Sequence, residues 1–109
     1  MHITTEQTDH LCRLHIAGEA TIYTVIELHR ELFKALVDCT ALEIDLSEVS
    51  DLDTAGFQQL LLAKREAVRL GKALRLVHHS AATRDVLDIY QMADYFDTPL
   101  GDSTVESPQ

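Results

Sequence analysis

The amino-acid sequence predicts an α/β domain built on a mixed sheet of four or five strands, with the helices mainly on one face. Segments that alternate polar and apolar residues, a pattern typical of half-buried strands, are interspersed with segments whose apolar residues recur at helical spacing. The resulting order is strand, strand, helix, strand, helix, strand, helix. Helices that connect strands act as crossovers, so we expect part of the sheet to be parallel.

Four segments have the composition and alternation of strands. The expected strands are residues 3–8, as a short edge strand, 11–17, 42–46 and 73–78. The alternation is clearest in the second segment, where Cys12, Leu14 and Ile16 share one face. The third segment alternates in the same way, which indicates two strands that each bury one face.

Three segments have helical periodicity. The expected helices are residues 22–38, 54–70 and 80–92. Leu28, Leu32 and Leu36 mark the apolar face of the first. Gly71 suits the position that follows the second helix, and Ser80 suits the N-cap of the third. The residues expected to face inward on the third helix are Val86, Ile89, Tyr90 and Ala93.

Length and charge limit the functions that the chain can have. A chain of 109 residues predicts one domain, which we place at residues 1–96, followed by an acidic, flexible tail at 97–109. The net charge of −9 argues against nucleic-acid binding and against an electrostatic hold on anionic lipid. No apolar run is long enough to insert into a membrane. Cys12 and Cys39 form no CxxC motif and no disulfide framework, so we expect a reducing cytoplasm.

Motifs for catalysis are missing from the sequence. It has no phosphate-binding glycine loop and no nucleophile elbow. Its six histidines lack the spacing of a metal site; His78 and His79, for example, are adjacent on a strand and point to opposite faces. We therefore expect no catalytic residue, no cofactor and no metal, and we predict that the protein is not an enzyme.

The start of the second helix is the candidate functional site. Asp53, Thr54, Ala55 and Gly56 open this helix, where the first backbone N–H groups lack partners within the helix. Thr54 is the candidate for docking or phosphorylation, while Asp53, Ala55 and Gly56 are expected to shape an interface. A simpler interpretation is that Asp53 or Thr54 only caps the helix.

Three further residues are expected to surround this helix start. They are Glu48, Ser50 and Asp51, in a segment that we interpret as a short acidic loop. A phosphate on Thr54 would add about two negative charges beside these acids. Such a modification would weaken an interface by repulsion without unfolding the domain.

The run Leu-Glu-Ile-Asp-Leu-Ser-Glu-Val-Ser-Asp-Leu-Asp-Thr-Ala-Gly-Phe, residues 42–57, resembles the signature of STAS domains, the fold of anti-sigma factor antagonists. The resemblance covers residues 3–96 and implies a STAS fold. In sporulation-type members, a kinase that is also the anti-sigma factor phosphorylates the second hydroxyl of Asp-Ser-Ser-Gly. That position is Ala55 here, which leaves two alternatives: Thr54 accepts the phosphate, or the domain docks constitutively.

The resemblance implies a protein-interaction module of bacterial signalling. The expected function is like that of an anti-sigma factor antagonist in the regulation of transcription, with an association to chemotaxis through similarity to small STAS proteins. The implied partner is a kinase-type anti-sigma factor or another signalling kinase. Asp-Thr-Ala-Gly also occurs in STAS subunits of phospholipid-transport ABC ATPases, where the Thr corner packs on the ATPase. The alternative function is therefore an accessory subunit of such a transporter.

Overall fold

The computed structural model describes residues 1–92 and 95–96, and these residues form an α/β domain. Its strands are β1 (His2–Thr8), β2 (Leu11–Ala20), β3 (Ala41–Leu52) and β4 (Ala73–Val77). They lie side by side in the order β1-β2-β3-β4. β1 is antiparallel to β2, whereas β2 and β3, and β3 and β4, are parallel. The predicted mixed sheet is confirmed, with four strands among the described residues.

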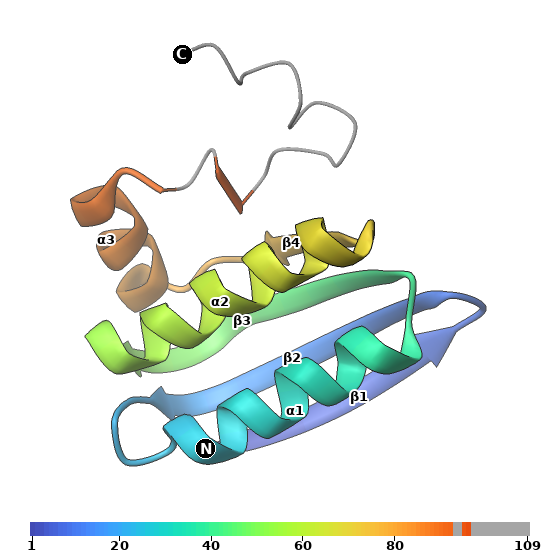
Figure 1. The fold of residues 1–109 in the computed structure, drawn as a ribbon. Coiled ribbons are helices and arrows are strands. Elements are labelled where there is room, and N and C mark those ends of the chain that lie inside the picture. Colours follow the sequence, from blue (N-terminus) through green and yellow to red (C-terminus); the bar gives the residue numbers. More distant parts are fainter. Residues whose placement is uncertain (93–94, 97–109) are drawn as a thin grey trace, which may run out of the picture.

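The helices of this part of the chain are α1 (Val25–Asp38), α2 (Thr54–Leu70) and α3 (Ala81–Tyr90). α1 and α2 run across the same face of the sheet, and their starts lie at the same end of the molecule (Figure 1). α2 and α3 begin at Asp53 and Ser80, whose side chains accept hydrogen bonds from backbone N–H groups. Gly71 ends α2 with a positive φ of 73°, as predicted for a glycine that closes a helix.

The core lies between the sheet and its helices. The alternating residues predicted for β2, Cys12, Leu14 and Ile16, are each at most 1% exposed. Leu28 and Leu32 of α1 are fully buried and belong to the same apolar cluster. The predicted apolar faces are thus confirmed. Each Å² of apolar surface removed from water stabilises the fold by about 25 cal/mol, which favours this two-layer arrangement.

Strand β3 corrects the expectation of an acidic loop before α2. The strand continues to Leu52, and its final residues pair with Gly18 and Ala20 of β2. Val49 and Leu52 turn into the core and are 2% and 5% exposed. Because the pairing shifts register along the two strands, the buried residues no longer alternate strictly. This irregularity conceals the strand in the sequence.

Two helices differ from their predicted form. α1 begins at Val25 because residues 21–24 form a turn in which the Thr24 hydroxyl donates to the carbonyl of Glu19, at 2.9 Å. In α3 the buried residues are Thr83 and Leu87. The prediction that Ile89 faces inward is wrong, since this side chain is 74% exposed. Ala93 lies outside the described residues.

The two cysteines also differ from expectation. Cys12 at the start of β2 and Cys39 at the end of α1 form a disulfide, with their Cα atoms 5.9 Å apart. They are 27 residues apart in the sequence, and no local motif signals such a pairing. The prediction that the chain has no disulfide is therefore wrong for this structure.

Candidate functional site

Asp53 joins the starts of two helices. Its Oδ1 accepts a hydrogen bond from the N–H of Gly56 at 2.9 Å, which caps α2. Its Oδ2 accepts from the N–H of Ile22 at 2.9 Å, in the turn before α1. The hydrogen bond from Gly56, helped by the one from Ile22, lowers the pKa of the carboxyl group below its ordinary value of 3.8. Asp53 thus holds the α2 start against the α1 turn.

This arrangement predicts a pH-dependent contribution of Asp53 to stability. Because the pKa of Asp53 is lowered by folding, its stabilising effect is present above about pH 4 and is lost as the pH falls through the folded-state pKa. Asp53→Asn retains a capping side chain without the charge. The difference in unfolding free energy between wild type and Asp53→Asn should be larger at pH 6 than at pH 3.

Urea unfolding at the two pH values measures this difference. Asp51→Asn is the matched control, because Asp51 is an exposed carboxylate two residues earlier in the chain. A difference for Asp53→Asn that does not change with pH would contradict the assigned role of the carboxylate.

Gly56 allows the backbone of α2 to approach the end of β2. A Cβ atom at this position would lie 2.0 Å from the carbonyl oxygen of Ala20. The N–H of Asp53 points to the same carbonyl, at 3.4 Å. Gly56 and Asp53 therefore both lie against the carbonyl of Ala20, and the start of α2 packs directly on the backbone of β2.

Thr54 and Ala55 follow the cap. Thr54 is exposed, and its hydroxyl lies 3.4 Å from the phenolic oxygen of Tyr90 at the end of α3. The Tyr90 ring stacks on Phe57, with centroids 4.8 Å apart and planes 7° apart. Ala55 is half-buried, and its methyl group can accept no phosphate. A hydroxyl is thus presented to solvent on a helix start that is anchored by a buried aromatic residue.

Exposed apolar side chains border this helix start. Ile22, Tyr23 and Ile26 are 58%, 91% and 77% exposed, on the turn and first residues of α1 that Asp53 holds. Together with Thr54 and Tyr90 we call them the corner patch. The apolar members were not predicted from the sequence, although Ile26 lies about 200° around the helix from Leu28 and so faces away from the core.

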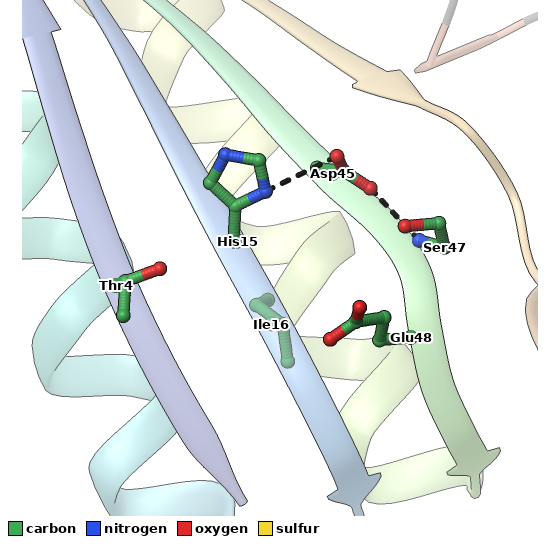
Figure 2. Close-up of a pocket in the computed structure, with 6 residues that line it drawn as sticks. All are labelled: Thr4, His15, Ile16, Asp45, Ser47 and Glu48. Carbon is green, nitrogen blue, oxygen red and sulfur yellow. Dashed lines mark hydrogen bonds and ion pairs between the residues drawn. The ribbon is translucent and has the colours of Figure 1, made fainter.

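The remaining predicted site residues are distributed along β3. Ser50 and Asp51 are exposed near its end. Glu48 instead lines a pocket on the sheet face opposite to the one that α1 and α2 cover (Figure 2). Asp53 follows Glu48 by five positions along an extended chain, which corresponds to about 16 Å. The structure therefore does not bring Glu48 to the corner patch.

The pocket beside Glu48 is polar and has a volume of about 380 Å³. Its other lining residues are Thr4, His15, Ile16, Asp45 and Ser47. His15 and Asp45 point toward each other, with Nδ1 and Oδ2 3.1 Å apart (Figure 2). Burial raises the pKa of Asp45, but hydrogen bonds from Ser47 and the charge of His15 outweigh it and lower the pKa. The backbone N–H of Ser47 donates one of these bonds, at 2.9 Å.

Across residues 1–92 and 95–96, no group of three or more His, Cys, Asp or Glu side chains is placed to hold a metal ion. Within the same part of the chain, no helix is both long enough and apolar enough to cross a membrane.

The sequence and the fold are both similar to those of known proteins. Residues 3–101 match the family described as "Mlab, STAS domain". The chain belongs to this STAS domain family. Among curated proteins, this STAS domain is similar to the intermembrane phospholipid transport system binding protein MlaB of Haemophilus influenzae, with 28% identity over 86 residues. The similarity covers 75% of this chain and 82% of the relative.

Solved structures share the fold of this STAS domain. An anti-sigma factor antagonist from Mycobacterium paratuberculosis superposes with a TM-score of 0.79 at 23% identity, covering 87% of this chain and 81% of the other. Unphosphorylated SpoIIAA has a TM-score of 0.72 at 18% identity, covering 84% and 83%. Phosphorylated SpoIIAA of Bacillus has a TM-score of 0.71 at 17% identity and covers 87% of both chains. The predicted STAS fold is confirmed.

Proposed function

We propose that this STAS domain is a non-enzymatic docking module that binds a protein partner through the corner patch. The main observation is that Ile22, Tyr23 and Ile26 are exposed on the turn and first residues of α1, which Asp53 holds to the α2 start, and that Thr54 at this helix start is also exposed. Adjacent apolar side chains exposed on a folded domain often mark an interaction site. Their burial in a partner, with an aromatic residue among them, provides the kind of contact that dominates binding energy.

The first candidate partner is a subunit of a phospholipid transport system. Three features support it: the family description "Mlab, STAS domain", the similarity to a phospholipid transport protein, and Ala55 at the usual phosphate-acceptor position. The resemblance of Asp-Thr-Ala-Gly to STAS subunits of transport ATPases suggests that the ATPase contacts the Thr54 corner. In this role the chain acts in the cytoplasm and needs no phosphorylation to bind.

The second candidate partner is a kinase-type anti-sigma factor or another signalling kinase. The exposed Thr54 hydroxyl favours it, because the side chain at the α2 start is accessible to a modifying enzyme. A phosphate on Thr54 would lie at the N-terminus of α2, where the helix dipole and the free backbone N–H groups stabilise a negative charge. The same phosphate would repel a partner that approaches with acidic groups.

A matched pair of substitutions in α1 tests the docking surface. Ile26 and Val37 are 77% and 76% exposed, but Val37 lies at the opposite end of the helix. We expect Ile26→Glu to weaken binding at least about 10-fold, since it places a charge in an apolar contact. Val37→Glu should leave the dissociation constant unchanged. Calorimetric titration with purified candidate ATPase subunit and kinase makes the comparison, and equal effects of the two changes would contradict the proposed surface.

Variants of Thr54 distinguish the two partner classes. Incubation with ATP and the candidate kinase, followed by mass spectrometry, should show no phosphate on Thr54 if the chain is a transport subunit. In that case Thr54→Ala should bind the ATPase subunit with nearly wild-type affinity. A phosphate on Thr54, with loss of kinase binding by Thr54→Glu but not by Thr54→Ala, would establish the signalling role instead.

A further inference from the structure

We propose that Cys12 and Cys39 form a reversible redox site that is oxidised by a hydroperoxide. The two Cα atoms are 5.9 Å apart, within the range of about 4.4–6.8 Å that disulfides require. The proposal is independent of the docking function and concerns the opposite end of α1 from the corner patch.

Backbone hydrogen bonds on both sides of the pair hold it in place. The N–H of Cys39 donates to the carbonyl of Ala35 at 3.1 Å, which closes the last turn of α1. The next residue, Thr40, donates its N–H to the carbonyl of His10, two residues before Cys12, also at 3.1 Å. These backbone hydrogen bonds do not involve the sulfur atoms, so they hold the two cysteine backbones together independently of the S–S bond.

One of the two cysteines borders a cavity. Cys12 and Cys39 are only 1% and 3% exposed, but Cys12 lines a cavity of about 180 Å³ between β1, β2 and α1. The other lining residues are Thr5, Gln7, Glu31, Lys34, Ala35 and Asp38. This volume is larger than the space of roughly 10–15 Å³ that a single water molecule needs. Hydrogen peroxide fits in this space, whereas glutathione disulfide is far larger.

The charged groups around the cavity are mixed. Lys34 lines the same cavity as Cys12, and a positive charge there would favour a thiolate, the reactive form of a thiol. Glu31 and Asp38 oppose it with their negative charge. We therefore expect Cys12 to react with peroxide more slowly than the cysteine of a dedicated peroxide-reducing enzyme. Such a cysteine would be oxidised during exposure to peroxide and would not turn over continuously.

The chemistry proceeds in two balanced steps. The Cys12 thiolate attacks one oxygen of hydrogen peroxide, the O–O bond breaks, and the departing hydroxide takes up a proton, which leaves Cys12 as a sulfenic acid. The Cys39 thiolate then attacks the Cys12 sulfur, the S–O bond breaks, and a second water forms. Two thiols lose two electrons, and one peroxide gains them. A small dithiol reverses the change by thiol–disulfide exchange and becomes a disulfide itself.

Oxidation should stabilise the fold, because the bond closes a loop of 27 residues in the unfolded chain. A crosslink of this length is expected to raise the melting temperature by about 10 °C. Treating the fully reduced protein with one equivalent of hydrogen peroxide should produce this rise. Mass spectrometry should then identify a peptide containing Cys12 linked to Cys39, and dithiothreitol should reverse both changes.

Single substitutions test the order of the steps. In Cys39→Ala, peroxide should leave a sulfenic acid on Cys12 that dimedone traps. In Cys12→Ala, Cys39 should react at least about 10-fold more slowly, because it does not line the cavity. Glutathione disulfide should oxidise the wild type much more slowly than peroxide.

Two results would overturn the proposal. One is that both cysteines can still be alkylated when the wild-type protein is treated with peroxide and then denatured. The other is equal peroxide reactivity of the two single variants. The wild-type alkylation result needs no variant to fold, and circular dichroism checks the folding of each variant.

Discussion

Replacing Gly56 by alanine is expected to destabilise the domain by about 3 kcal/mol or more. The added Cβ would lie 2.0 Å from the backbone oxygen of Ala20, and 2.8 Å from its carbonyl carbon. A backbone carbonyl in a paired strand cannot turn aside as the end of a flexible side chain can. The helix start must therefore move, which also disturbs the hydrogen bond from the Gly56 N–H to Asp53. The greater helix propensity of alanine offsets only up to about 1 kcal/mol.

Gly71→Ala is the matched control at the other end of the same helix. A Cβ there would meet nothing within 4 Å, so the cost comes only from its φ of 73°. That conformational cost is about 1 kcal/mol. Urea unfolding of the two variants measures the difference. If Gly56→Ala costs no more than Gly71→Ala, the close contact of α2 with the end of β2 is absent.

Replacing Phe57 by alanine is expected to cost about 3–5 kcal/mol, the range for removing a buried aromatic side chain. Phe57 is 4% exposed and stacks on Tyr90 of α3. Phe96 contacts the same ring edge-on, with centroids 6.2 Å apart. The substitution therefore leaves a cavity and removes the contact that positions Tyr90 near the Thr54 hydroxyl. Partner binding should weaken along with stability if the corner patch is the docking site.

Leu62→Ala provides the control for this effect on the same helix. Leu62 is 39% exposed, so its truncation should cost less than about 1 kcal/mol. Denaturant unfolding compares the two variants, and binding is measured below the unfolding transition of each. A cost for Phe57→Ala as small as that for Leu62→Ala would mean that Phe57 is not a core anchor.

Local patterns in the sequence predicted most of the fold. The bounds of α2 are correct because Asp53 supplies a cap and Gly71 a left-handed end, both of which depend on neighbouring residues. The buried face of β2 is correct because a strand with one face in the core alternates residue by residue. The predicted helix start at the candidate site exists for the same local reason, while its role in docking stays a prediction.

Features that depend on distant residues were not predicted. β3 is longer than its alternation indicates because irregular pairing with β2 shifts the buried positions. Lys64 has a charged side chain and yet is only 4% exposed, and its Nζ donates to the carbonyl of Leu74 at 2.9 Å. Burial of this kind requires a partner placed by the fold, and periodicity along one helix carries no information about it.

For the α2 start, the sequence by itself determined a capped helix that opens with a hydroxyl at Thr54 and has no acceptor at Ala55. These properties follow from residue type and spacing along a few turns of chain. Only the tertiary structure decided that Asp53 also binds the N–H of Ile22 and that Gly56 rests on Ala20. The tertiary structure also decided that the turn with the exposed Ile22 and Tyr23 is held at this helix start, and that Cys12 meets Cys39. Each of these contacts joins segments at least about twenty residues apart, which become neighbours only when the parallel strands pair.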